Sequence, residues 1–448
     1  MRKDLIAACI ATVTLGLPAM ALPPLQSPRP ELRPSTNLTI VTVSSQGSPL
    51  AVSRSLRPLL RSAPQPIVID AQVAVAQADF AQWQADFRNR ALAQGIRPAI
   101  FDSAFAGVVV NPRVITRDSN QAEFSRTLWE YLDGAVSEVR IANGRAALAR
   151  HADTLARIER RYGVEAEVVL AVWGLESAYG AMRGNSDIIT AMATLAHEGR
   201  RRDFFEAELI AAMRILQAGD VAPRQMTGSW AGAMGHTQFM PTSYLAHAVD
   251  FNGDGRRDIW SDDPTDALAS TANYLRHHGW TTGQPWGVEV VLPQGFDYSL
   301  TGEGTKRGAG FWRRQGVRLT NGAQVPDHGQ AAILLPAGHR GVALMIFNNF
   351  HVIERYNPAD AYVIGIGHLA DRIAGAGPFR ASWPRGERGL SRAEREELQR
   401  RLAARGMHSG TVDGIIGPQT ADSVRRFQAS VGLVPDGFAS LGVLERLR

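Results

Sequence analysis

The residue best placed to do chemistry is Glu176, near the end of the apolar stretch at 164–180, VEAEVVLAVWGLESAYG. Val172 lies four residues before Glu176 and Trp173 three residues before it, spacings that place the three side chains on one face of a helix. A carboxyl group held against Val and Trp has its charged form disfavoured, so we expect its pKa to be raised. Such a group can donate a proton near neutral pH, which makes Glu176 a candidate general acid. The stretch alone is equally compatible with a helix-end Glu that pairs with an arginine.

A second candidate element is the glycine-rich segment at 228–244, GSWAGAMGHTQFMPTSY. Its glycines allow the backbone to pass close to a ligand or to another segment. The polar side chains of Ser229 and Gln238 lie among Trp, Met and Phe side chains. This mixture suits a sugar site, where rings stack on apolar faces and amides bind hydroxyl and acetamido groups. A loop packed tightly between two helices would have the same composition.

Residues 250–261, DFNGDGRRDIWS, have the spacing of a calcium-binding loop. The candidate ligands occupy its alternating early positions and its ninth position: Asp250, Asn252, Asp254 and Asp258. The final position, where a bidentate Glu is expected, holds Ser261, and Asp262 and Asp263 follow it. Three readings remain open: one of those two aspartates closes the loop, calcium binds weakly, or the segment is a turn without metal.

The histidines offer no further site. His197, His236 and the adjacent His277 and His278 lack metal-ligand spacing. We expect them to be ordinary surface or capping residues.

The elements that must position these residues are helices. Apolar residues recur at helical spacings between 79 and 280 and no strand alternation occurs there, so we expect this region to be all-α. The expected helices are 79–95, 123–161 with a break at Gly144, 164–180, 187–196, 202–216 and 264–278. The side chains expected to face inward on the first of these are Phe80, Trp83, Phe87 and Leu92. From Gly287, short alternating runs punctuated by Gly and Pro predict a small β insertion, and a last helix is expected from about residue 359.

The N-terminus predicts export. A short basic region precedes an apolar run and the small-residue pattern Ala19-Met20-Ala21, which together are typical of a signal peptide at 1–21. We therefore expect a periplasmic protein. Cys9 is the one cysteine of the chain, and too little apolar sequence precedes it to favour lipoprotein anchoring. Although the net charge is +5, basic residues are interspersed with acids, which argues against nucleic-acid binding.

Two segments of the chain are linkers by composition. Residues 22–75 are rich in Pro, Ser and Arg and are predicted to be flexible. Residues 379–389 resemble an interdomain linker. The tail at 390–448 is predicted to be a small helical unit of the kind that serves exported enzymes as a binding module.

Residues 79–378 resemble the catalytic domain of the lytic murein transglycosylase B family. The matching segments occur in the family's order: LESAYG, HEGRRRDFF, GSWAGAMGHTQFMPTSY, VDFNGDGRRDIW, DALASTANYLRHHGW and RYNPADAY. The tail resembles a three-helix peptidoglycan-binding domain through LQRRL, DGIIGPQT, RRFQ and GLVPDG. The resemblance implies a mainly α protein: a lysozyme-like catalytic domain at 76–378 with a small β insertion, followed by a three-helix domain at 390–448.

The resemblance also implies cleavage of the bond between N-acetylmuramic acid (MurNAc) and N-acetylglucosamine (GlcNAc) in peptidoglycan, with Glu176 as the acid/base. The residues that match the family's glycan cleft are Ser229, Gln238, Tyr274, Tyr356, Asn357 and Tyr362. Residues 250–258 match its calcium loop, and no cofactor is required. The expected partner is the glycan strand, with a monomeric enzyme and at most peripheral association with the envelope. Tyr274 and Tyr362 would suit core tyrosines as well, and Ser229 would suit a helix cap.

The expected reaction needs one carboxyl group. Glu176 would protonate the glycosidic oxygen and then deprotonate the C6 hydroxyl of the same MurNAc, giving a 1,6-anhydro end. Ordinary glycosidases need two carboxylates, and we expect no second acid within 164–245 in so apolar a setting. Two alternatives remain: a muramidase that hydrolyses the same bond with water, and a wall-binding protein that keeps the fold without catalysis.

Overall fold

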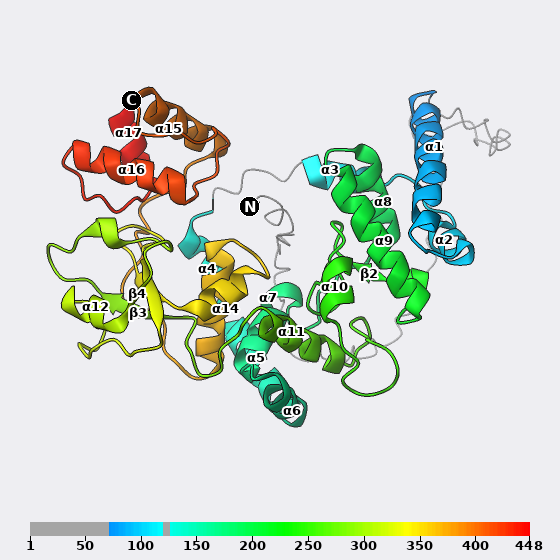
Figure 1. The fold of residues 1–448 in the computed structure, drawn as a ribbon, viewed down its shortest axis with the longest axis horizontal. Coiled ribbons are helices and arrows are strands. Elements are labelled where there is room, and N and C mark those ends of the chain that lie inside the picture. The colour runs from blue at the N-terminus through cyan, green and yellow to red at the C-terminus, as the bar shows by residue number, and fades with distance from the viewer. Residues whose placement is uncertain (1–70, 120–125) are drawn as a thin grey trace, which may run out of the picture. The chain divides into compact units, whose positions relative to one another are not determined.

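The structure, a computed structural model, describes residues 71–119 and 126–448 (Figure 1). The predicted signal peptide at 1–21, Cys9 and residues 22–70 of the predicted flexible segment lie outside the described residues. The first helix, α1 (Ala71–Ala93), takes in the remainder of that segment. Across the two described ranges, no helix is long and apolar enough to cross a membrane.

The helix α1 buries the aromatic stripe that its sequence predicts. Phe80, Trp83 and Phe87 are buried, and the rings of Trp83 and Phe87 stack with centroids 5.2 Å apart. Leu92, predicted to point inward, is only partly buried, and Ala91 is buried in its place. Ala91 lies one helical turn after Phe87 and continues the stripe, whereas Leu92 falls off that face. Two short helices follow: α2 (Pro98–Phe105) and α3 (Pro112–Ser119).

Three helices occupy the next part of the chain: α4 (Leu128–Ala135), α5 (Glu138–Arg150) and α6 (Ala152–Tyr162). The break predicted at Gly144 is wrong, because Gly144 lies inside α5 and is buried. A Cβ at this position would overlap the side chains of Ile373 and Tyr179. The glycine therefore permits close packing, and the chain turns at His151 instead.

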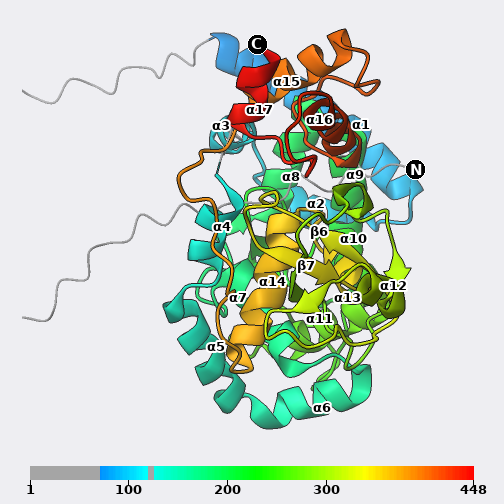
Figure 2. The ribbon, with the colours of Figure 1, turned by 90° about the vertical axis from the view of Figure 1, so that its left-hand side faces the viewer.

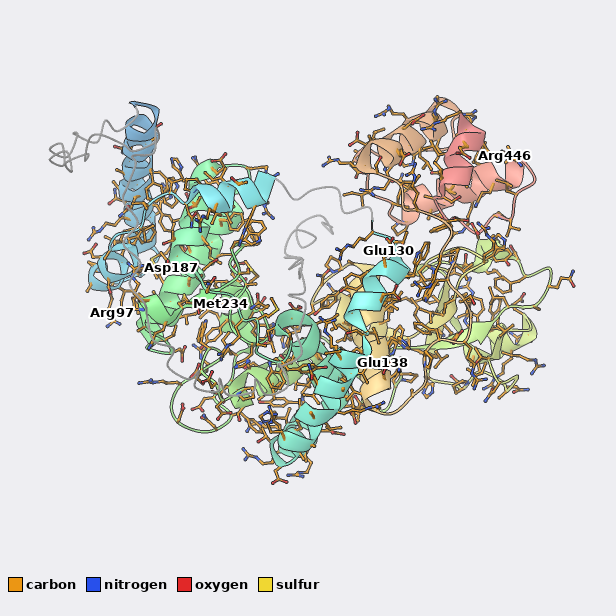
Figure 3. The ribbon with its side chains drawn as sticks, turned by 180° about the vertical axis from the view of Figure 1, so that it is seen from behind. Arg97, Glu130, Glu138, Asp187, Met234 and Arg446 are labelled. Atoms are coloured by element: carbon orange, nitrogen blue, oxygen red, sulfur yellow. The ribbon has the colours of Figure 1, made fainter. Side chains whose placement is uncertain are left out.

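The central part of this region is mainly helical, as predicted, and its helices are α7 (Ala166–Ser177), α8 (Ile188–Glu198), α9 (Arg202–Ala218), α10 (Pro241–His247) and α11 (Thr265–His277). Two strands of two residues each, β1 (Ser186–Asp187) and β2 (Thr227–Gly228), pair antiparallel where no strand was expected. This pairing holds the glycine-rich segment against the start of α8, and Figure 3 labels Asp187 and Met234 on these two segments.

The β insertion predicted from Gly287 is an antiparallel sheet with the order β4-β6-β7-β3-β5. Its strands are β3 (Gly287–Val291), β4 (Arg307–Gly308), β5 (Arg318–Leu319), β6 (Gln330–Leu334) and β7 (Ala343–Ile346). The short helix α12 (Ala309–Arg314) supplies Trp312, which is fully buried and donates its indole N–H to the carbonyl of Ala331 at 3.0 Å. The sheet thus has an apolar core of its own, separate from the helical core.

The chain then returns to the helical core through α13 (Asn348–Glu354) and α14 (Asp360–Ile373). The helix α14 packs against α7, α4 and α13 (Figure 2). Two glycines allow this approach: Gly365 faces Tyr131 and Leu175, and Gly367 faces the indole of Trp286. The helix that carries Tyr362 is therefore held tightly against α7, which carries Glu176.

The tail contains the three helices predicted for it: α15 (Arg392–Ala404), α16 (Pro418–Ser430) and α17 (Leu441–Leu447). Each of the first two helices holds the Asp-Gly turn that follows it through a buried glutamine. Gln399 accepts from the amide of Gly414 at 2.8 Å, and Gln428 accepts from the amide of Gly437 at 2.8 Å. The Asp-Gly pairs thus act as turns anchored to the helices.

Two helical glycines should respond in opposite ways to replacement by alanine. A Cβ at Gly367 would overlap the Trp286 ring, whereas a Cβ at Gly134 in α4 meets nothing within 4 Å. We expect Gly367→Ala to lower the free energy of unfolding by about 1–3 kcal/mol through overpacking. The matched control Gly134→Ala should raise it by up to about 1 kcal/mol, since alanine is the better helix former. Denaturant unfolding measures both, and equal effects would contradict the packing assigned to α14.

Candidate active site

Glu176 lies on the last turn of α7, a helix whose preceding residues are almost all buried. Beyond this turn the backbone takes three successive positive φ angles, at Ala178, Tyr179 and Gly180. Left-handed backbone is costly for residues with a Cβ and is found where surrounding structure enforces it, often at functional sites. The strained turn ends the helix immediately after Glu176 and leaves this side chain partly exposed.

The carboxyl group of Glu176 has the electrostatics predicted for an acid. Burial raises its pKa to about 7, and the hydrogen bond from Tyr362 offsets part of that rise. The Tyr362 hydroxyl donates to Oε1 of Glu176 at 2.6 Å across 186 residues of sequence. The group can therefore be protonated near neutral pH and yet have a donor ready to stabilise its ionised form.

Three tyrosines form a connected row next to Glu176. The rings of Tyr362 and Tyr356 stack with centroids 6.5 Å apart, and Tyr356 meets Tyr274 at 5.0 Å. Burial, followed by the charge of Glu176, raises the pKa of both Tyr356 and Tyr362. Burial raises the pKa of Tyr274 to about 12. All three hydroxyls are therefore neutral donors at physiological pH.

Backbone carbonyls hold two of these hydroxyls. Tyr356 donates to the carbonyl of Thr237 at 2.5 Å, and Tyr274 donates to the carbonyl of Arg355 at 2.6 Å. The structure thus brings together Glu176 and the three predicted cleft tyrosines, and it ties them to the glycine-rich segment. Tyr274 and Tyr362 are buried, which agrees with the alternative of core tyrosines as well as with a place beside the acid.

The other predicted cleft residues shape the backbone around the site. Ser229 Oγ accepts from the amides of Ala231 and Ala233, which closes a turn instead of capping a helix. Gln238 has a positive φ of 55°, and its amide nitrogen donates to the carbonyls of Gly235 and Arg183 at 2.7 and 2.9 Å. Asn357 Oδ1 accepts from the amide of Ala359 and forms the turn before α14. All three side chains are partly exposed.

A further tyrosine that sequence reasoning did not assign to the site is Tyr131 in α4. Burial, followed by the charge of Glu176, raises its pKa. Its ring also lies against Gly365 of α14. The helical pattern around Tyr131 could not place it beside Glu176, because helical spacing predicts which residues share a face but not which residues they contact.

His236 corrects the prediction that it is an ordinary surface or capping residue. It is buried, accepts from the indole N–H of Trp173 at 3.0 Å, and contacts the carbonyl of Ser261 at 2.7 Å through Nε2. His278, by contrast, is the C-cap residue of α11, in agreement with the prediction, and its ring lies 4.4 Å from that of Tyr274. Burial against Trp173, which the sequence spacing could not reveal, accounts for the difference at His236.

We expected no second acid in an apolar setting within 164–245, and this expectation is wrong. Glu208 of α9 is buried, and burial raises its pKa. Its two oxygens accept from the amide and the hydroxyl of Thr242, at 2.9 and 2.7 Å. Both bonds fall in the first turn of α10, so Glu208 caps that helix and is engaged there.

The loop at 250–261 gathers carboxylates, but its members differ from the sequence prediction. Oxygen atoms of Asp250, Asp254 and Asp266 lie within 4.8 Å of one another. The side chain of Asp258 instead accepts from the amides of Trp260 and Ser261. Asp266, in the first turn of α11, was not predicted, because it lies beyond the twelve-residue pattern.

The two aspartates proposed to close this loop are engaged elsewhere. Asp262 pairs with Arg183 at 2.8 Å, and Asp263 accepts from the amide and hydroxyl of Thr265 at the start of α11. Asn252 lies within the loop, where its Oδ1 accepts from the amide of Asp254. Asp250 and Asp254 of the loop and Asp266 of α11 therefore present three carboxylates, hard oxygen donors of the type that Ca²⁺ prefers. The residues present fit that ion.

Known protein families and solved structures resemble this chain in sequence and in fold. Residues 79–371 match the family model described as the transglycosylase SLT domain. The chain belongs to this family. Residues 391–447 match the putative peptidoglycan binding domain. The family resemblance, the mainly α lysozyme-like fold and the C-terminal domain predicted from the sequence are thus confirmed.

The relatives of this SLT-domain chain include characterised enzymes. Membrane-bound lytic murein transglycosylase B of Escherichia coli K12 is 33% identical over 243 residues, which are 52% of this chain and 64% of the relative. SltB3 from Pseudomonas aeruginosa, solved in complex with NAG-anhNAM-pentapeptide, is 50% identical with a TM-score of 0.81, over 82% of this chain and 99% of SltB3. E. coli Slt35, solved in complex with calcium, is 28% identical with a TM-score of 0.55, over 68% of this chain and 98% of Slt35.

The hydrogen bond from Tyr362 should set the pH range of any activity that needs protonated Glu176. Removing it in Tyr362→Phe leaves the carboxylate without its donor, so the pKa of Glu176 should rise further. A hydrogen bond to a charged group contributes about 1.5–3 kcal/mol, equivalent to a shift of about one to two pKa units. Activity that is lost as pH rises through this pKa should then persist to higher pH.

A pH–rate profile of the variant tests this expectation. Tyr274→Phe is the matched control, since its hydroxyl bonds a backbone carbonyl and not Glu176. The alkaline limb should move only in Tyr362→Phe. An alkaline limb at the same pH in both variants would show that the Tyr362 hydrogen bond does not set the pKa of Glu176.

Proposed function

We propose that this protein is a lytic transglycosylase that cleaves the MurNAc–GlcNAc bond of peptidoglycan and leaves 1,6-anhydroMurNAc ends. The proposal rests on the setting of Glu176. Burial raises its pKa to about 7, and its Oε1 accepts a hydrogen bond from the Tyr362 hydroxyl. Membership of the SLT-domain family and the likeness to SltB3, solved with an anhydro-sugar fragment, support it.

In the first step Glu176 acts as the acid. Its proton passes to the glycosidic oxygen as the bond to C1 of MurNAc breaks. A pKa near the working pH is the most effective for such a transfer. As Glu176 loses its proton, the Tyr362 hydroxyl at 2.6 Å stabilises the carboxylate that forms.

In the second step the same carboxylate acts as the base. Glu176 removes the proton from the C6 hydroxyl of MurNAc, and the oxygen attacks C1 of the same sugar to close the 1,6-anhydro ring. The positive charge that builds on the sugar between the steps is stabilised by the substrate's own acetamido group. The other buried acids of 164–245 are engaged elsewhere: Glu208 is bonded to Thr242 and Asp220 to Arg257. This supports a mechanism with one carboxyl group.

The proposal also covers where the protein acts, how it stays on its substrate and which metal ion it binds. The predicted signal peptide places the protein in the periplasm, where its substrate is. The C-terminal domain holds it on the peptidoglycan. The three carboxylates of Asp250, Asp254 and Asp266 bind a structural Ca²⁺, as the calcium complex of Slt35 suggests for this chain. The ion would hold the loop in shape and is not a reactant.

The mass of the muropeptides tests the reaction. Purified peptidoglycan digested by the enzyme should yield products lighter by one water than the hydrolysis products. Glu176→Gln, which keeps the shape but cannot transfer a proton, should lower the rate by at least about 10²-fold. Glu167→Gln, in the first turn of the same helix, serves as the control and should retain activity. Reducible ends would indicate a muramidase, and digestion by Glu176→Gln would exclude Glu176 as the catalyst.

Thermal unfolding with and without calcium tests the metal site. An ion that binds only the folded state should stabilise it by about 2.7 kcal/mol at 100 times its dissociation constant. Asp250→Asn should reduce this gain, because it removes one of the three gathered carboxylates. Asp263→Asn, whose side chain caps α11 instead, should keep the gain. An unfolding midpoint that is the same in calcium and in chelator would rule the site out.

A further inference from the structure

His236 lies where the catalytic helix, the glycine-rich segment and the loop at 250–261 meet. Two of its partners flank Glu176 in sequence. The indole N–H of Trp173 donates to its Nδ1 at 3.0 Å, and the hydroxyl of Ser177 donates to its carbonyl at 2.5 Å. The residue three positions before Glu176 and the residue after it are thus both fixed to His236.

The opposite side of His236 is fixed to the end of the loop at 250–261. Its amide donates to the carbonyl of Ile259 at 3.0 Å, and its Nε2 lies 2.7 Å from the carbonyl of Ser261. Asp258 in turn holds the amide of Ser261 at 3.0 Å. One histidine therefore spans the distance between the loop and α7.

These contacts select one tautomer of the imidazole. Nδ1 accepts from Trp173 and so carries no proton, which leaves the proton on Nε2 to be donated to Ser261. Arg183 lies 3.3 Å from Nε2, but both groups are donors there, and Arg183 is bonded to the carbonyls of Trp260 and Ser261. His236 is a neutral bridge with one acceptor and one donor, each in use.

Gly180 packs directly against the imidazole ring of His236. A Cβ at Gly180 would lie 2.7 Å from the imidazole, and Gly180 has a φ of +86°. The strained turn after Glu176 thus packs directly on His236. The neighbouring Thr237 accepts from Tyr356, which stacks on Tyr362, so the same segment also reaches the tyrosine that holds the carboxyl group.

We propose that His236 is a positioning residue for Glu176: its two ring hydrogen bonds and its backbone hold the last turn of α7 against the loop at 250–261. The inference rests on the proposed role of Glu176. One carboxyl group that must reach two different substrate atoms in turn tolerates little displacement, and a misplacement of about 1 Å can cost about 10²-fold in rate.

Two substitutions separate the two ring bonds. His236→Asn keeps an acceptor near the Nδ1 position and loses the donor to Ser261, whereas His236→Gln keeps a donor near the Nε2 position and loses the acceptor for Trp173. We expect each variant to lower kcat by about 10- to 100-fold, while KM changes by less than about twofold because neither bond is made to substrate. The indole N–H resonance of Trp173 should move in His236→Gln and stay close to its wild-type position in His236→Asn.

The matched control is His151→Gln. His151 meets the same indole edge to face at 5.6 Å from the side of α6, and the hydrogen bond of the Trp173 indole goes to His236. We expect wild-type kcat for this control. Both His236 variants within about twofold of wild-type kcat would overturn the positioning role, as would a loss that follows only the fraction of folded protein measured by circular dichroism.

One measurement on the wild-type protein keeps the inference testable if the variants do not fold. The nitrogen chemical shifts of the His236 ring should show a neutral imidazole protonated at Nε2. A ring protonated at Nδ1 would contradict the proposed bridge. If the proposed function is wrong, the wild-type protein will yield no anhydro products. That result does not depend on the imidazole nitrogen shifts, so the two failures can be told apart.

Discussion

The hydrogen bond between Tyr362 and Glu176 is the contact on which the site depends. Burial alone would favour a carboxyl group that keeps its proton, and a solvated Glu would lose it too readily. With the hydroxyl 2.6 Å away, the pKa is about 7, and both protonation states of Glu176 are within reach. A group that must be an acid and then a base needs this balance, because neither form can be strongly preferred.

The surrounding fold holds these two side chains at that distance. Tyr362 is on α14 and Glu176 on α7, so the hydrogen bond requires the two helices to pack closely. Glycines inside α14 and α5 make room for Tyr131, Trp286 and Tyr179. The tyrosine row then extends to Thr237 through Tyr356. The glycine-rich segment thus contributes its backbone to the site as much as its side chains.

Local patterns in the sequence were enough to place Glu176 on a helix with a raised pKa, and to locate most helices and the β insertion. They failed where the deciding contact is distant in sequence. His236 meets Trp173 across 63 residues, and no spacing around His236 reveals that partner. The sequence pattern predicted a helix break at Gly144. The glycine is needed there because the side chain of Ile373, in another helix, packs against it. Asp266 was missed because the loop motif ends before it.

The same burial that makes Glu176 an acid has a cost for the folded state. An unfolded Glu has a pKa near 4.5 and the folded one about 7, so the folded protein binds this proton more tightly. The stability that this group contributes is full below the unfolded pKa and is lost as pH rises through the folded one. Above pH 7 the difference is on the order of 3 kcal/mol. That energy has to come from packing elsewhere, and the almost completely buried α7 and the network around His236 are where the structure supplies it.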